Sequence, residues 1–261
     1  MDGALRGEAR ALVRSARALL VELAEEGVEG ADRTHAPPAL AARAARPPAD
    51  RPASSAGSDP VTARASDAPG SAERPTLDAV RSALGDCTRC RLCEGRTNIV
   101  FGDGSPTADL MFIGEGPGEQ EDLRGLPFVG RAGELLTSMI EKGLGLQRSD
   151  VYICNIVKCR PPGNRTPLPD EVAACRPFLE GQIDAVAPRV IVALGKPATS
   201  LLLGRDVAIT KVRGTWHAHR GIPVMPTFHP AFVLRQYTPE NRRLVWEDLK
   251  AALKRAREGE R

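Results

Sequence analysis

Short apolar runs alternate with helical patterns from residue 76 onward. Four of these runs are continuously apolar and are flanked by Gly or Pro, which predicts buried strands at 108–116, 151–157, 189–195 and 222–228. Apolar positions three or four residues apart predict helices near 131–144, 170–187, 197–203 and 239–257. Buried strands separated by helices are typical of an α/β fold, here a three-layer α/β/α arrangement around a mostly parallel central sheet.

The first 75 residues have a different pattern. Residues 5–23 place apolar side chains on one helical face, which predicts a single amphipathic helix that ends near Gly27. Residues 34–75 are rich in Ala, Pro, Arg and Ser and contain no Phe, Trp or Tyr, a composition typical of disordered linkers. We therefore expect an N-terminal extension over residues 1–75 and one folded domain over residues 76–261.

Charge and hydropathy limit the class of protein. Charged residues make up 26% of the chain, and no apolar run approaches the roughly 18 residues of a membrane-spanning helix, so we expect a soluble protein. The N-terminus mixes Glu with Arg and lacks the apolar region of a secretory signal, which favours a cytoplasmic location. The net charge of +3 permits a polyanionic partner but does not require one.

Six cysteines in a reducing compartment are more typical of metal ligands or free thiols than of disulfides. Cys87 and Cys90 form a CxxC pair, and Cys159 and Cys175 lie on either side of a Pro-rich loop. Four thiolates can bind Zn²⁺ or an iron–sulfur cluster, and the residues alone do not choose between the two. The remaining two, which we rank as spare thiols, are Cys93 and Cys154.

Three polar motifs fall at or near the carboxyl ends of predicted strands, where parallel sheets bind ligands. The first is GEGPGEQED, whose glycines let backbone amides approach a ligand and whose Glu115 supplies an acceptor or a base. The second is Asn155, whose amide needs polar partners if it is buried. The third is His229, which follows the last predicted strand.

Each of these residues also has a structural interpretation. The acidic motif can be a solvated turn, a single His is more often structural, and Phe128 in RGLPFVGRAG is well explained by core packing. A basic cluster, KVRGTWHAHRG, contains Lys211 and Arg213 on a predicted hairpin. Such a cluster suits contacts to phosphate, and it is equally typical of a solvated charged face.

Taken together, the motifs resemble a known family. In order and spacing, the chain is similar to the family 4 uracil-DNA glycosylases, which carry a [4Fe-4S] cluster, in the segments CTRCRLCEGRTNIVFGDG, LMFIGEGPGEQED, PFVGRAGELL, VYICNIVKCRPPGNRTPLPDEVAAC, ITKVRGTW and FHPAFVLR. The resemblance covers about residues 76–252 and leaves out residues 1–75. It implies a uracil-DNA glycosylase-like fold. It also implies hydrolysis of the bond between uracil and deoxyribose, which leaves an abasic site and initiates base excision repair.

The resemblance also implies a metal site and DNA contacts. The expected ligands of the [4Fe-4S] cluster are Cys87, Cys90, Cys159 and Cys175, and we expect the cluster to have a largely structural role. Arg160 and Arg165 are then available for phosphates. Weaker candidates for contact with the DNA backbone come from the basic cluster, Lys211 and Arg213.

A uracil pocket is implied as well, because such an enzyme must extrude the nucleotide from the base stack. Phe128 would stack on the flipped ring, and Asn155 would accept from N3–H and donate to O4. His229 would donate to O2 as negative charge develops on the departing base. The loop expected to contact uracil contains Gly114, Glu115 and Gly116, and a side chain that helps to exclude the thymine methyl is Glu121.

Two explanations are open for how the attacking water is activated. The family 1 enzymes carry an Asp at the position of Gly116, and the nearest carboxylate in this chain is Glu115. Either Glu115 orients the water or a dissociative reaction proceeds without a protein base. The expected catalytic residues are therefore His229, Asn155 and Glu115.

Three alternatives are kept. A related branch that traps uracil-DNA covalently carries Gln at the position of Gly116 and a basic insertion, and this chain has neither. The chain can also be a non-catalytic uracil-DNA-binding iron–sulfur protein or a structural zinc protein. The expected partner is uracil-containing DNA, single- or double-stranded; we expect no membrane partner and a monomeric protein.

Overall fold

The computed structural model describes residues 74–258. The predicted helix over residues 5–23 and nearly all of the predicted linker lie outside the described residues. None of the helices within residues 74–258 combines the length and the apolar character that a membrane span requires.

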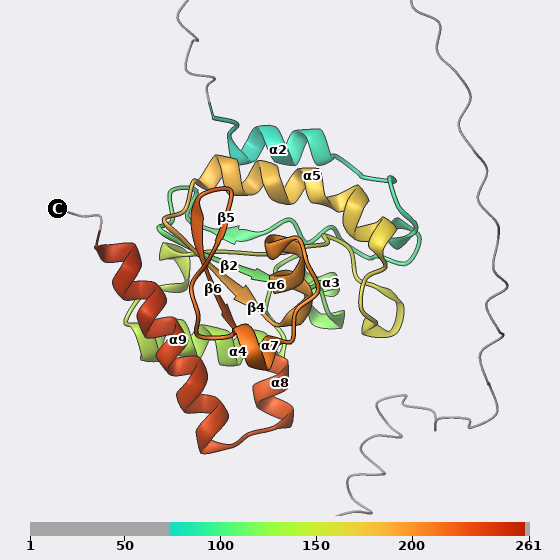
Figure 1. Cartoon of the computed structure of the whole chain (residues 1–261). Coiled ribbons are helices and arrows are strands. Elements are labelled where there is room, and N and C mark those ends of the chain that lie inside the picture. Colours follow the sequence, from blue (N-terminus) through green and yellow to red (C-terminus); the bar gives the residue numbers. More distant parts are fainter. Residues whose placement is uncertain (1–73, 259–261) are drawn as a thin grey trace, which may run out of the picture. The chain divides into compact units, whose positions relative to one another are not determined.

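Six strands form one sheet in the order β1-β3-β2-β4-β6-β5 (Figure 1). The four central strands are parallel: β3 (Tyr152–Asn155), β2 (Leu110–Gly114), β4 (Val190–Leu194) and β6 (Ile222–Thr227). The two edge strands are antiparallel to their neighbours: β1 (Asp103–Gly104) and β5 (His217–His219). The prediction of a mostly parallel central sheet is confirmed.

Helices cover both faces of the sheet, so the fold has three layers. Alternate strand residues face opposite layers, as the pleat requires. Phe112 and Ile153 pack in the cluster that contains α4 (Arg131–Ser138), the π-helix η2 (Met139–Leu144) and α9 (Pro239–Arg257). The other cluster contains Ile113 and Cys154 and packs against α5 (Pro169–Val186) and α6 (Lys196–Leu203). The first described helix, α2 (Leu77–Leu84), packs on α5.

The four long predicted helices lie within one residue of the observed bounds, with 131–144 divided into α4 and η2. The sequence pattern missed several shorter elements, since three to six residues do not establish a helical period. These elements are α3 (Glu119–Arg124), α7 (Ile209–Val212), α8 (Pro230–Arg235), η1 (Arg91–Cys93), η3 (Arg148–Asp150) and η4 (Pro162–Asn164).

The topology brings three strand ends to one edge of the sheet. Gly114, the last residue of β2, is the register partner of Asn155, the last residue of β3. Strand β6 ends at Thr227, and His229 follows as the N-cap of α8. Because parallel strands end together, the motifs after β2, β3 and β6 meet at this edge.

Candidate active site

A cavity of about 480 Å³ lies at this edge. Its walls come from the segment after β2, the loop before α4, the end of β3, the Pro-rich loop and the start of α8. The lining residues are Glu115, Gly116, Pro117, Gly118, Glu121, Phe128, Ala132, Asn155, Pro161, Asn164, Arg165, Thr166, Pro167, His229, Ala231 and Arg235. The structure therefore brings together five of the six predicted uracil-binding residues around one cavity.

The sixth, Gly114, lies immediately beside the pocket. A Cβ atom at this position would be 2.4 Å from Oδ1 of Asn155 and 2.5 Å from Cζ of Phe128. No side chain fits there, since Cβ atoms do not approach other atoms this closely. The glycine therefore allows the amide and the phenyl ring to lie against the end of β2.

Asn155 is only 1% exposed, yet its Oδ1 has no hydrogen-bond partner within residues 74–258. A buried amide oxygen without a partner costs about 1–3 kcal/mol of stability, so native structures rarely leave one unsatisfied. Asn155 is one of the residues that line the cavity. A bound molecule with an N–H group can satisfy it.

Phe128 has a backbone conformation that is unusual for its residue type. Its φ is +51°, in the left-handed region, which costs a bulky residue about 1–3 kcal/mol. Gly133 accommodates this turn: a Cβ there would lie 2.0 Å from the carbonyl group of Phe128. The Phe128 ring faces the imidazole of His229, with centroids 5.6 Å apart and planes inclined by 33°.

His229 is half-buried and held by its own helix. The backbone N–H of Ala231 donates to Nδ1 at 3.1 Å, so Nδ1 is unprotonated and Nε2 carries the hydrogen of the neutral ring. Burial, together with the positive charge of Arg235, lowers the pKa of His229 to about 4. The ring is therefore a neutral donor at physiological pH.

Two carboxylates line the pocket and differ in their partners. Glu121 accepts hydrogen bonds from Gly118 (3.1 Å), Val129 (2.9 Å) and Gly130 (2.8 Å) through both carboxylate oxygens. This side chain therefore holds the loop around Phe128, a function that the sequence did not predict. The carboxylate of Glu115 has no hydrogen-bond partner within residues 74–258 and is free to bind water or substrate.

Two of the predicted DNA-contacting cations lie in the pocket wall or beside it. Arg165 lines the cavity and makes a bidentate ion pair with Glu171, at 2.8 and 2.6 Å. The hydrogen bonds from Arg165 keep the pKa of the buried Glu171 carboxyl below its usual value. Arg160 donates to Oδ1 of Asn164 at 2.8 Å, next to the cavity wall.

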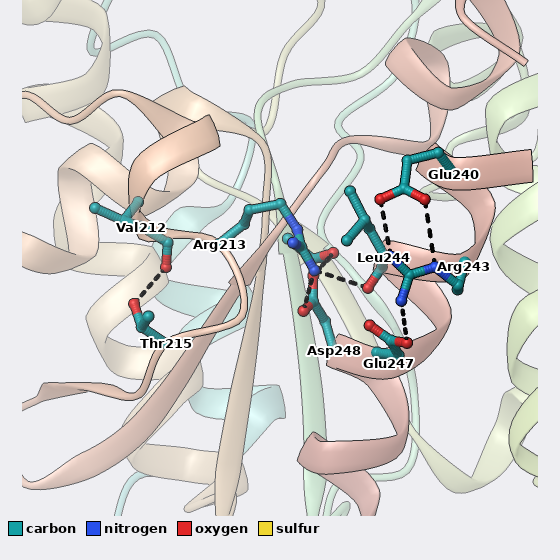
Figure 2. Close-up of polar contacts among 9 residues, drawn as sticks. Val212, Arg213, Thr215, Glu240, Arg243, Leu244, Glu247 and Asp248 are labelled. Atoms are coloured by element: carbon teal, nitrogen blue, oxygen red, sulfur yellow. Dashed lines mark hydrogen bonds and ion pairs between the residues drawn. The ribbon is translucent and has the colours of Figure 1, made fainter. Parts of the chain in front are cut away.

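The other two lie elsewhere. Lys211 is exposed in α7. Arg213 is turned inward, where its guanidinium donates to Asp248 and to the carbonyl of Leu244 at 2.8 Å (Figure 2). Its side chain is 14% exposed and that of Asp248 is 2% exposed. The predicted phosphate contact of Arg213 therefore has no support in the geometry, because a buried carboxylate takes up its charge.

A second cavity is lined by all four predicted metal-binding thiols, Cys87, Cys90, Cys159 and Cys175. Cys93 also lines it, whereas Cys154 packs in the core beneath the sheet. Arginine side chains donate to two of the sulfurs: Arg89 to Cys87 at 3.3 Å and Arg96 to Cys159 at 3.5 Å. Four thiols with cationic neighbours are a donor set that suits an iron–sulfur cluster.

The thiols are not arranged around a single ion as they stand. Within residues 74–258, no three His, Cys, Asp or Glu side chains form a group that could hold one metal ion. Burial raises the pKa of Cys159 to about 11, and burial also raises the pKa values of Cys90 and Cys175. The neighbouring thiols add to each of these increases. A cation among the sulfurs would have the opposite effect and favour the thiolates.

Comparison with known proteins places these features in a family. Residues 101–250 match the uracil DNA glycosylase superfamily. The chain is 51% identical to a type-4 uracil-DNA glycosylase of Thermotoga maritima, over 67% of this chain and 92% of the relative. Type-4 enzymes of Sulfurisphaera tokodaii and Saccharolobus solfataricus are 47% and 46% identical, over 67% of this chain and 82% and 83% of the relatives. The chain belongs to the type-4 uracil-DNA glycosylases.

The superfamily match in this type-4 uracil-DNA glycosylase contains every lining residue of the pocket. It also contains Cys159 and Cys175, while Cys87 and Cys90 precede it. Several lining residues of this family member were missed by the sequence analysis. The polar PGNRT run between prolines was a signal for Asn164 and Thr166, which lie beside the predicted Arg165; no signal pointed to Ala132, Ala231 or Arg235.

Proposed function

We propose that the chain hydrolyses the N-glycosidic bond of uracil in DNA and leaves an abasic site. The observation that carries this proposal is the unpartnered Oδ1 of Asn155, a residue that lines a cavity together with Phe128 and His229. The names of the type-4 relatives support the same activity. The alternatives are covalent trapping of uracil-DNA and binding without catalysis.

The first step is extrusion of the nucleotide, because the glycosidic bond cannot be reached within the base stack. A cavity of about 480 Å³ is large enough for a pyrimidine with part of its sugar. The flipped ring would stack on Phe128, whose phenyl group lies between the end of β2 and His229. Stacking and contacts to the backbone offset the cost of unstacking, about a few kcal/mol.

Asn155 supplies the discrimination between uracil and cytosine. Its Oδ1 would accept from N3–H of uracil, and its amide N–H would donate to O4. Cytosine presents the reverse pattern at these two positions, so it would leave two buried groups unpaired. Burial of Asn155 makes this mismatch costly, because water cannot enter to satisfy the groups.

His229 would stabilise the departing base. The neutral ring presents Nε2–H as a donor, and the bond from Ala231 to Nδ1 fixes the direction of that donor. Negative charge develops on uracil O2 only as the glycosidic bond breaks. A fixed donor aimed at this oxygen therefore acts mainly in the transition state.

Glu115 would orient the attacking water. Its carboxylate lines the pocket without a partner among the described residues, whereas the other lining carboxylate, Glu121, is bonded to three backbone amides. A dissociative reaction with an oxocarbenium-like sugar needs only weak activation of water. Glu115→Gln should then lower the rate of uracil release modestly and leave the affinity for uracil-containing DNA unchanged.

We further propose that Cys87, Cys90, Cys159 and Cys175 hold a [4Fe-4S] cluster. The support is the shared cavity and the two arginines that donate to sulfur. When bound, such a cluster would link the segment that contains η1 to the Pro-rich loop and α5. Iron and acid-labile sulfide of about four each per chain, with absorbance near ~400 nm, would support the cluster over zinc.

The phosphates of the DNA backbone would be bound by Arg160, Arg165 and Lys211. The N-terminal 75 residues would be dispensable for chemistry. The support is that all pocket-lining residues lie between 115 and 235. We propose a monomer with a cytoplasmic location, where its substrate DNA and a reduced cluster coexist. A truncated chain that starts at residue 76 should release uracil at the rate of the full chain.

One assay tests the function. Purified protein with measured iron content is mixed with uracil-containing oligonucleotides, single-stranded and duplex, and free uracil and abasic sites are quantified. We expect multiple turnovers with release of uracil. A gel shift without abasic product would support the binding protein, and a denaturation-resistant adduct would support covalent trapping.

A further inference from the structure

Phe128 occupies a conformation that its own residue type disfavours, so other groups must hold it there. Its φ of +51° belongs to the left-handed region, which glycine adopts more readily than a bulky residue. The orientation of the phenyl ring depends on φ and ψ of this residue. These two angles are set by the peptide planes on either side of it, 127–128 and 128–129.

The peptide plane on the C-terminal side is held by Glu121. One carboxylate oxygen accepts from the backbone N–H of Val129 at 2.9 Å and from that of Gly130 at 2.8 Å. The N–H of Val129 belongs to the 128–129 peptide, so this bond restricts ψ of Phe128.

The peptide plane on the N-terminal side is held by Arg148, a residue outside the pocket lining and in none of the motifs. Its guanidinium donates to the carbonyl of Pro127 at 2.5 Å and to Oγ1 of Thr137 at 3.0 Å. Nε lies 3.7 Å from the carboxylate of Asp103 in β1. The Pro127 carbonyl belongs to the 127–128 peptide, so this bond restricts φ of Phe128.

Arg148 is itself well placed to be rigid. Its side chain is 18% exposed, and its three contacts come from different elements: the edge strand β1, helix α4 and the loop before α4. A planar guanidinium with several fixed donors holds its acceptors in defined directions. Arg148 and Glu121 therefore hold the two peptide planes that flank Phe128, Arg148 on the N-terminal side and Glu121 on the C-terminal side.

We propose that Arg148 is a positioning residue that orients Phe128 for stacking on the extruded base. This inference rests on the proposed function, since it assigns the Phe128 ring to the substrate. Glu121 contributes to the same orientation by holding the 128–129 peptide plane. Loss of Arg148 would let the 127–128 peptide rotate toward an unstrained φ and move the ring away from the end of β2.

A double-mutant cycle tests the proposal in the full, cluster-loaded chain. Arg148→Ala should lower kcat/KM for uracil release by about ten- to a hundredfold, the size expected for a misplaced binding group. In a Phe128→Ala background the same change should cost less than about twofold, because the ring that Arg148 positions is gone. A full loss in both backgrounds would overturn the proposal and assign Arg148 a general structural role.

Two further variants control for folding. Arg189→Ala is the matched control, since Arg189 also pairs with an aspartate, Asp109 at 3.0 Å, and donates to a carbonyl, that of Ala256 at 3.3 Å. Because the Arg189 side chain is more exposed than that of Arg148, Arg189→Ala should lower the melting temperature no more than Arg148→Ala does, and it should retain wild-type kcat/KM. If Arg148→Ala does not fold, Thr137→Val, which removes one acceptor of Arg148, should give a smaller loss with the same dependence on Phe128.

A readout without catalysis separates this inference from the proposed function. A crystal structure of Arg148→Ala, or of Thr137→Val if the first does not fold, should show Phe128 with a changed φ or more than one ring position. An unchanged Phe128 would overturn the inference even in an active enzyme. Absence of uracil release by the wild-type chain would instead overturn the proposed function.

Discussion

The backbone N–H of Ala231 donates to Nδ1 of His229 across 3.1 Å, within the first turn of α8. The bond leaves Nε2 as the only protonated nitrogen of the neutral ring. It also means that a second proton would have to displace the Ala231 N–H, so protonation and reorientation of the ring are linked.

Removal of the imidazole should affect chemistry more than binding. His229→Ala is expected to raise the barrier for uracil release by about 2 to 4 kcal/mol, in the range found for single oxyanion donors. Affinity for uracil-containing DNA should change little, because the donor acts as charge develops on O2. Single-turnover rates and equilibrium binding measure the two effects, and parallel losses in both would contradict the assignment.

The rate of uracil release should show no transition at the pKa of an ordinary histidine. Because burial and Arg235 lower the pKa of His229 to about 4, the ring stays neutral as the pH falls from 8 to 5. The single-turnover rate should therefore show no transition near ~6.5, the usual pKa of histidine, and should fall only as the pH approaches the folded-state value. If the rate halves near the usual pKa in the wild type but not in His229→Gln, the His229 ring titrates with the ordinary pKa of histidine and the prediction is wrong.

The same shift has a consequence for stability. The unfolded chain binds a proton at His229 below its ordinary pKa, while the folded chain resists it until about pH 4. The associated stabilisation is complete above the unfolded pKa and is lost as the pH falls through the window between the two values. The melting temperature of the wild type should therefore fall further than that of His229→Gln across this window.

Asn155→Asp should weaken discrimination between bases. A carboxylate can accept from N3–H of uracil but cannot donate to O4, so the pattern that excludes cytosine is half removed. The ratio of kcat/KM values on uracil- and cytosine-containing oligonucleotides should fall. An unchanged ratio, at a melting temperature close to wild type, would remove Asn155 from base recognition.

Gly114→Ala should damage the pocket although it adds one methyl group. The new Cβ would lie 2.4 Å from Oδ1 of Asn155 and 2.5 Å from Cζ of Phe128, so both groups must move. Overpacking of this kind costs about 1–3 kcal/mol, and here the displaced atoms are those that contact the base. Gly95→Ala is the control, because its Cβ would meet no atom within 4 Å and Gly95 needs no unusual φ. Equal kcat/KM in the two variants would contradict the role of Gly114.

The cysteine cavity offers a paired test. Cys90→Ser should abolish the absorbance near ~400 nm and lower the melting temperature, since the cluster contributes to folding. Cys93→Ser changes a thiol of the same cavity that we do not assign as a ligand, and it should keep both iron and stability. Loss of iron in Cys93→Ser and its retention in Cys90→Ser would reverse the ligand assignment.

The sequence predicted the features that follow from local pattern. The run ADLMFIGEG is apolar at every central position, as expected for a strand buried on both faces, and the structure places β2 there. Parallel strands end together, so the meeting of Asn155 and His229 at one edge also followed from pattern and topology. Edge strand β1, only two residues long, had no pattern to detect.

Contacts between side chains far apart in the sequence could not be predicted from the sequence pattern. Arg213 was predicted to face DNA because it lies in a basic run, but its partner Asp248 is 35 residues away in a helix whose other charges are exposed. Glu121 was assigned to the thymine methyl, and the structure shows its oxygens on three backbone amides. Composition gives the sign of a charge, whereas its partner depends on the folded geometry.

Gly114 sets a limit on how this pocket can be altered. Protein engineers usually widen a binding site by shortening the side chains that wall it, but the group at this position is already a single hydrogen atom. Space for a bulkier base on this side of the pocket would therefore require retraction of the main chain of β2, which lies between β3 and β4. On this side, the width of the pocket is set by the sheet itself and not by a replaceable side chain.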